Sequence, residues 1–436
     1  MTTNGAAEQV GRFTLDNGLR LVTAPASTGQ VASVNLWYDV GSRHEVPGRT
    51  GFAHLFEHLM FQGSGNVTKA EHFDLVERLG GDINASTSTD RTNYYETVPT
   101  HALDLILWLE ADRLATLREG MTQEVLDNQR DVVKNERRQR YDNQPYGTAL
   151  ERILRLAYPE GHPYHHPTIG SMADLDAADL DYVKSFHELH YGPDNCVLTV
   201  VSDLEPQDVL ARVEKYFGPI PARSTVPEIP DPSLTTPLAG PVRDDVTETV
   251  PAPGVFLGFR VPAYGERGFD VMHLASAVLG QGQGSRLYRS LVVDRQIAAD
   301  DGGAAADVLP FRYTDSLLLV NMLAREGVDG QELESAMREE VFRLAEGVSE
   351  TELERARAVL ERDHLQSISS PAGLADALSS CTQLFGDPEL AHTWPRRWAD
   401  ITAEEVQAAA ESLLVEANSL VVRFDPEPAT VAASQS

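Results

Sequence analysis

The chain has 436 residues, of which 42% are hydrophobic and 23% charged, and its formal net charge is −30. These proportions are typical of a globular protein with two or three domains. A charge this negative is repelled by nucleic acid and by anionic membrane surfaces, so we expect neither as a partner. A basic peptide or a basic protein surface would be attracted. An equally good interpretation is that the negative charge only keeps the protein soluble.

The first residues and the cysteines bear on location. The sequence MTTNGAAEQVGRF has no basic region followed by an apolar one, so we expect no signal peptide. No apolar run approaches the roughly 20 residues that span a bilayer. Cys196 and Cys381 could form one disulfide, but two buried thiols in a reducing compartment fit better. We therefore expect a cytoplasmic protein.

The first predicted elements are strands. Residues 13–15 and 19–22 alternate in polarity on either side of Asp16-Asn17-Gly18, which favours a type I′ hairpin. Residues 31–40 (VASVNLWYDV) predict a further strand, and residues 41–50 a loop.

The stretch at residues 51–63 (GFAHLFEHLMFQG) carries the clearest chemical signal. On a helix, His54 and His58 lie one above the other, so both imidazoles can bind one zinc ion. Glu57 edges the same face and could act as the base towards a zinc-bound water. The flanking residues are apolar, and a His-Glu-His cluster in such a helix is costly unless it is paired or bound to metal. The alternative is two core histidines beside a helical salt bridge.

The segments that follow are polar. Residues 69–79 predict an amphipathic helix that ends at Gly80-Gly81. Residues 82–98, rich in Thr and Tyr, predict one long strand or a hairpin whose polar character suits an exposed sheet edge. Two helices are expected next, at residues 101–117 and 123–141.

Two later stretches resemble ligand-binding sites, but a structural role explains each of them better. His162, His165 and His166 lie in a proline-containing loop without regular ligand spacing, so we expect them to be structural. The glycine-rich run at residues 280–284 lacks both the Walker Lys-Ser/Thr pair and the GxGxxG spacing. A helix junction that packs close to a neighbour explains it better.

An internal repeat predicts the architecture. The tripeptides that begin at Ala173 and Ala399 each precede a helix and a closing strand, and they are 226 residues apart. We therefore predict an α+β fold of two homologous halves, residues 1–217 and 243–436, each an antiparallel sheet flanked by helices. The proline-rich residues 218–242 would link them.

The order H-x-x-E-H at residues 54–58 inverts the common zinc-peptidase motif. With the segments around it, this motif resembles the pitrilysin/insulinase-type (M16) metallopeptidases over nearly the whole chain. The resemblance is to the short-chain branch that includes mitochondrial processing peptidase and bacterial zinc peptidases. It implies a processing-peptidase-like fold, with only the first half binding metal.

The resemblance also implies a third zinc ligand and a substrate strand. The family places a glutamate at a similar distance beyond the second histidine, and Glu136 follows His58 by 78 residues, within VVKNE. Glu124 lies three turns away, and Asp131 projects from another side. In the family the strand matching residues 82–98 takes the substrate as an added strand, which would bring Asn84 and Ala85 to it. An ordinary polar edge strand is an equally good interpretation.

Three positions depart from the family pattern. Gln129 stands where many members have a second glutamate, two turns before the ligand. Single-chain and homodimeric members have an Arg and, seven residues later, a Tyr that bind substrate. Aligned through Arg295, these positions are Val292 and Ala299. Losing such a donor typically costs about 10²–10³-fold in rate. We therefore expect a heterodimer with a related subunit that carries the pair. The alternative is a homodimer that uses Arg286, Tyr288 or backbone amides.

These patterns together predict a zinc-dependent endopeptidase that hydrolyses extended peptides or processes a precursor. His54, His58 and Glu136 would bind Zn²⁺, and Glu57 would be the base. Two alternatives remain: a non-catalytic scaffold subunit, and a module that binds peptides without hydrolysing them.

Overall fold

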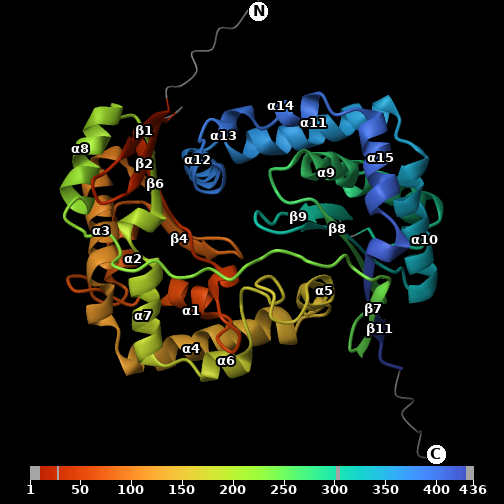
Figure 1. Ribbon diagram of the computed structural model, residues 1–436, viewed down its shortest axis with the longest axis horizontal. Coiled ribbons are helices and arrows are strands. Elements are labelled where there is room, and N and C mark those ends of the chain that lie inside the picture. The colour runs from red at the N-terminus through yellow and green to blue at the C-terminus, as the bar shows by residue number, and fades with distance from the viewer. Residues whose placement is uncertain (1–9, 27–28, 301–304, 429–436) are drawn as a thin grey trace, which may run out of the picture. The chain divides into compact units, whose positions relative to one another are not determined.

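The computed structural model describes residues 10–26, 29–300 and 305–428 (Figure 1). The chain forms two compact units, and neither is contiguous in sequence. The described residues of the first unit lie within Met1–Asn135, His166–Asp231 and Asp363–Trp394. Those of the second lie within Glu136–His165, Pro232–Arg362 and Pro395–Ser436.

The first unit is built on a six-stranded sheet. In the order in which they pair, its strands are β1 (Gly11–Thr14), β2 (Arg20–Pro25), β6 (Cys196–Ser202), β3 (Val31–Tyr38), β5 (Thr92–Pro99) and β4 (Asp82–Thr87). Its helices are α1 (Phe52–Leu59), α2 (Glu71–Arg78), α3 (Leu103–Gly120), most of α4 (Gln123–Arg137), α6 (Met172–Asp176), α7 (Leu180–His190), α8 (Pro206–Phe217), α12 (Pro371–Phe385) and α13 (Leu390–Thr393).

The second unit is built on a five-stranded sheet. In pairing order, its strands are β7 (Val242–Glu248), β11 (Ser419–Pro426), β8 (Gly254–Val261), β10 (Ser316–Leu323) and β9 (Ala306–Leu309). Its helices are α5 (Ala149–Ala157), α9 (Arg267–Gly280), α10 (Gly330–Phe342), most of α11 (Glu350–Ser367), α14 (Arg396–Ala399) and α15 (Ala403–Leu413).

The two sheets share one topology, which confirms the repeat. The order β2-β6-β3-β5-β4 recurs as β7-β11-β8-β10-β9. The pair β2 and β6 and the pair β7 and β11 run parallel, and the other pairs are antiparallel. The sheets are therefore mixed, whereas the sequence predicted antiparallel ones, because strands that are far apart in the sequence need not reverse direction to lie side by side.

A helix from the opposite half of the sequence packs on each sheet. Helix α12 packs on the first sheet through Leu374, Ala375 and Leu378, against the Trp37 and Val197 side chains. Helix α5 does the same for the second sheet, where its apolar residues join those of β11 and β7. The domain boundaries predicted at residues 217 and 243 come from the sequence repeat. The compact units are defined by contacts and do not test these boundaries, which stay a prediction.

A polar contact fixes α12 in register. The Asp376 carboxylate accepts hydrogen bonds from Trp37 Nε1 at 2.8 Å and from Asn93 Nδ2 at 2.9 Å. Since the donors stand on neighbouring strands β3 and β5, a shift of α12 by one residue would break both bonds.

The structure decides between two local alternatives and refines the end of one predicted helix. Residues 82–98 form a hairpin (β4 and β5), the second of the two predicted possibilities. The helix predicted for residues 123–141 ends at Arg137 and continues as a π-helical turn, Arg138–Asp142. Gly280 confirms the expected close packing, since a Cβ there would lie 2.1 Å from the Ala306 backbone nitrogen.

Two further observations concern the cysteines and the helices. Cys196 and Cys381 are both buried and not disulfide-bonded. Within residues 10–26, 29–300 and 305–428, every helix is too short or too polar to cross a bilayer.

Shortening Leu378 to alanine should destabilise the protein by about 2–5 kcal/mol, because its side chain is fully buried between α12 and the sheet. Chemical denaturation monitored by circular dichroism measures the change. Leu365→Ala is the matched control, because Leu365 is 53% exposed and should change stability by less than about 0.5 kcal/mol. Equal effects of the two substitutions would contradict the role given to α12.

Candidate metal centre

A buried carboxylate fixes the start of α1. Glu45 accepts hydrogen bonds from the backbone N–H groups of Gly51 at 2.9 Å and Ala53 at 2.7 Å, which otherwise lack helical partners. Gly51 is left-handed, with φ +87°, and a Cβ there would lie 2.6 Å from the Ile169 carbonyl oxygen. Glu45 precedes the helix by seven residues, and nothing in this spacing predicts its role.

The packing of α1 determines which side chains remain accessible. Phe52, Leu55, Phe56 and Leu59 are buried, and the Phe56 ring lies 4.5 Å from that of Tyr191, centroid to centroid. The polar residues therefore occupy the remaining face.

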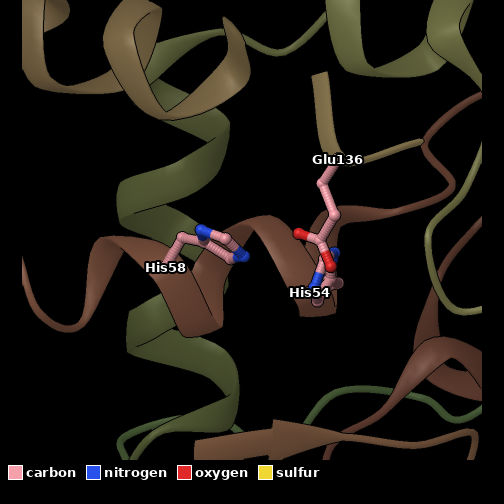
Figure 2. Close-up of side chains that lie close together, drawn as sticks. All are labelled: His54, His58 and Glu136. Carbon is pink, nitrogen blue, oxygen red and sulfur yellow. The ribbon is translucent and has the colours of Figure 1, made fainter. Parts of the chain in front are cut away.

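On that face the two histidines meet the glutamate from α4. The rings of His54 and His58 have centroids 4.8 Å apart and are nearly perpendicular. A nitrogen of each and a carboxylate oxygen of Glu136 all lie within 4.8 Å of one another, and all three residues are partly buried. Figure 2 shows Glu136 reaching down beside His54, while the His58 ring points towards the same region from the next turn of α1.

The position of Glu136 follows from the continuity of α4. The boundary between the compact units falls between Asn135 and Glu136, but the helix continues to Arg137. Glu136 is therefore placed by the same helix that packs in the first unit through Leu126 and Val133. Arg140, one turn later, lies 2.8 Å from Glu136 Oε1 and steadies the carboxylate.

The three donors fit a zinc ion. Two ligands at about 2.0–2.2 Å from a tetrahedral zinc are about 3.3–3.6 Å apart, so donors that all lie within 4.8 Å are close enough to share one ion. Two imidazoles and one carboxylate are also the ligand set of zinc sites that keep a fourth position open for water or substrate.

Glu57 is held by the sheet edge. Thr87 Oγ1 donates a hydrogen bond of 2.5 Å to Glu57 Oε2. Thr87 is the last residue of β4, the edge strand, so this bond joins α1 to the end of that strand. The sequence analysis missed Thr87, although the Ser/Thr run in this segment was the available signal.

Asn84 and Ala85 lie on β4 as predicted, and their contact with a substrate stays a prediction. Among the strands that the structure describes, β4 pairs with β5 alone, so its other side is open. The Ala85 N–H donates to Asn84 Oδ1 at 2.8 Å. Asn84 is exposed, and Ala85 is half-buried.

The competitors for the third ligand lie elsewhere. Glu124 and Asp131 are exposed on α4 and do not join the donor group. Gln129 is buried two turns before Glu136, where its amide donates to Asn128 Oδ1 at 3.1 Å.

The histidine loop is structural, as expected. The His162 ring stacks on Tyr158 with centroids 5.0 Å apart, and its Nε2 lies 2.9 Å from the Pro232 carbonyl oxygen. His165 Nδ1 lies 2.8 Å from the Tyr158 carbonyl oxygen. Neither they nor His166 belong to a donor group in the described part of the chain.

Comparison with known proteins agrees with the geometry. The model of the family described as Insulinase (Peptidase family M16) matches residues 20–170, and that described as Peptidase M16 inactive domain matches residues 177–360. The chain is 29% identical over 418 residues to zinc protease PqqE of Helicobacter pylori, covering 95% of this chain and 92% of that one. It is 27% identical over 415 residues to an uncharacterized zinc protease of Mycobacterium tuberculosis, covering 92% and 90%.

Solved structures share the fold. The crystal structure of a protease from Helicobacter pylori superposes with a TM-score of 0.87 at 28% identity, covering 96% of this chain and all of that one. A peptidase M16 inactive domain from Pseudomonas fluorescens gives a TM-score of 0.81 at 16% identity, covering 96% and 98%, and supports the fold alone.

Replacing Glu136 with alanine should remove the zinc ion bound at the α1–α4 site, because only the two imidazoles of the three donors would remain. The measurement is zinc per chain by inductively coupled plasma mass spectrometry after dialysis. Glu124→Ala, which removes an exposed carboxylate from the same helix, is the matched control and should keep the ion. If both variants kept the same zinc at this site, Glu136 would not be a ligand.

Proposed function

Because this chain belongs to peptidase family M16, the insulinase family of zinc proteases, we propose that it is an endopeptidase that hydrolyses extended peptides at the α1–α4 site. One observation carries this proposal. The three donor atoms of His54, His58 and Glu136 meet beside a carboxylate, Glu57, that is hydrogen-bonded to the end of an open edge strand.

The residues divide the chemistry between them. His54, His58 and Glu136 would hold the zinc ion, which would polarise a carbonyl and lower the pKa of a water molecule. Glu57 accepts the proton from that water as its oxygen attacks the scissile carbonyl carbon. Glu57 then gives the same proton to the amide nitrogen as the carbon–nitrogen bond breaks. The Thr87 hydroxyl donates to Glu57 Oε2 and helps to orient the carboxylate for this proton transfer.

An extended peptide can add to β4 as a further strand. The Ala85 N–H faces the open side of the strand, since it bonds to the Asn84 side chain. An incoming peptide carbonyl would replace that side chain as the acceptor. Ala85 is two residues, about 6.8 Å, from Thr87, so a peptide in this register runs towards Glu57. The net charge of −30 favours basic peptides.

We propose further that a related subunit completes the site. Val292 is buried in a π-helical turn, Tyr288–Asp294, and neither it nor Ala299 has a side-chain donor. The alternative donors are engaged elsewhere. Arg286 Nε lies 2.7 Å from Glu352 Oε1, and the Tyr288 hydroxyl donates to Asp300 at 3.1 Å. These contacts support a heterodimer over a homodimer that uses Arg286 and Tyr288. A cytoplasmic location also stays a prediction.

Replacing Glu57 with glutamine should leave the zinc content unchanged, because Glu57 is not among the three donors. Peptide hydrolysis should fall by about 10²–10⁴-fold, the usual contribution of a general base. Cleavage of a quenched fluorescent peptide library, with zinc measured on the same samples, tests both. Hydrolysis at the wild-type rate would exclude Glu57 as the base, and tight peptide binding by the wild type without turnover would favour a binding module.

Thr87→Val tests the hydrogen bond between Thr87 and Glu57. Valine keeps the shape of threonine but cannot donate to Glu57, so kcat should fall by about 10–100-fold, in proportion to a lost hydrogen bond to a charged group. Thr89→Val is the matched control, because Thr89 lies in the turn beyond β4 and no hydrogen bond of its hydroxyl to Glu57 is found in the described structure.

The isolated chain should cleave peptides slowly, and addition of a related subunit that carries an Arg–Tyr pair should accelerate cleavage by about 10²-fold or more, because donors to the oxyanion are then present. Steady-state rates with and without the candidate subunit measure this. Mutating the partner's Arg or Tyr should abolish the activation. Full activity of the isolated chain would refute the heterodimer without affecting the role of Glu57.

A further inference from the structure

A second group of metal-ligand side chains lies in the first unit, outside the site described above. His72 of α2, Glu96 of β5 and Glu110 of α3 each place a donor atom within 4.8 Å of the other two. The side chains of Glu96 and Glu110 are completely buried and that of His72 is 6% exposed.

Several polar atoms of this group are left unsatisfied. Both carboxylate oxygens of Glu96 and Nε2 of His72 are buried and have no hydrogen-bond partner among the residues that the structure describes, whereas Oε1 of Glu110 lies 2.6 Å from Arg113 Nη2. A buried ionised carboxylate without a partner costs several kcal/mol or more. Some further species must therefore neutralise Glu96.

Arg113 does not fill this role. Its guanidinium lies 2.6 Å from Glu110 and 3.8 Å from Glu96, and it stacks 4.3 Å above the Tyr94 ring. One cation facing two carboxylates leaves one negative charge. The contact is compatible with a metal ion, because carboxylates that bind metal are commonly hydrogen-bonded to further residues.

The distances favour a cation over a proton. His72 Nε2 lies 3.9 Å from Glu96 Oε1 and 3.7 Å from Glu110 Oε1. These separations are too long for hydrogen bonds but close to the roughly 3.3–3.6 Å between ligands of one tetrahedral zinc. A proton shared by Glu96 and Glu110 would satisfy one oxygen of each and leave His72 Nε2 unsatisfied, whereas one metal ion contacts all three donors.

We propose that His72, Glu96 and Glu110 form a second, structural metal site for a divalent ion of the zinc or manganese class. The ion would join α2, α3 and β5, and β5 is the strand on which the edge strand β4 lies. This site does not depend on the peptidase activity, since its ligands differ from those of the α1–α4 site.

Metal analysis of the full chain tests the proposal. Protein purified from zinc- and manganese-supplemented cells is dialysed and its zinc, manganese and iron are measured per chain. The wild type should hold two ions, Glu136→Ala one and Glu96→Gln one. Glu77→Gln, an exposed glutamate of α2, is the control and should keep both. Adding zinc or manganese to metal-free Glu136→Ala should raise its melting temperature, and the double variant Glu136→Ala/Glu96→Gln should show no such rise.

Each result decides the question. One ion in the wild type and none in Glu136→Ala would overturn the proposal in favour of a shared proton. Glu96→Gln would then mimic the protonated carboxyl group and keep both stability and the remaining ion. If Glu96→Gln does not fold, the wild type and Glu136→Ala decide together, because two ions in the wild type and one in Glu136→Ala support the second site, whereas a single ion in the wild type refutes it. None of these outcomes depends on whether Glu57 is the catalytic base.

Discussion

The structure depends on the burial of one face of each sheet by a helix from the other half of the sequence. On the first sheet, Trp37 and Val197 contact α12, and on the second, strand residues such as Phe424 join the cluster that includes α5. Burying such side chains contributes about 1.5–3 kcal/mol each, so neither sheet is stable with this face in water. The two sheets share one strand order, yet each compact unit also includes a segment from the other half of the sequence.

This exchange also determines where the third metal donor lies. To bring α5 to the second unit, the chain must leave the first after α4, and Glu136 is the first residue beyond that boundary. The candidate metal centre thus combines α1, whose start is fixed by Glu45, with the last turn of α4.

Sequence reasoning identified what depends on local spacing. His54, Glu57 and His58 share one helix, so the period of 3.6 residues predicts their common face, and the repeat predicted two similar sheets. Glu136 required the resemblance to a family, because its distance from α1 depends on tertiary packing. Glu45, Thr87 and the buried His72 group were missed for the same reason: each acts on a residue of another element, and no sequence period encodes that contact.

The open side of β4 makes the protein more prone to aggregate. An unpaired edge strand binds any extended chain, including the same strand of another copy, and so promotes aggregation. The Asn84 side chain occupies the Ala85 N–H, so one outward donor is already satisfied in the free protein. A net charge of −30 adds long-range repulsion between copies, which weakens at high ionic strength. Resistance to aggregation and the capacity to accept peptides therefore depend on the same strand. High ionic strength weakens the repulsion between copies and so favours association through this strand.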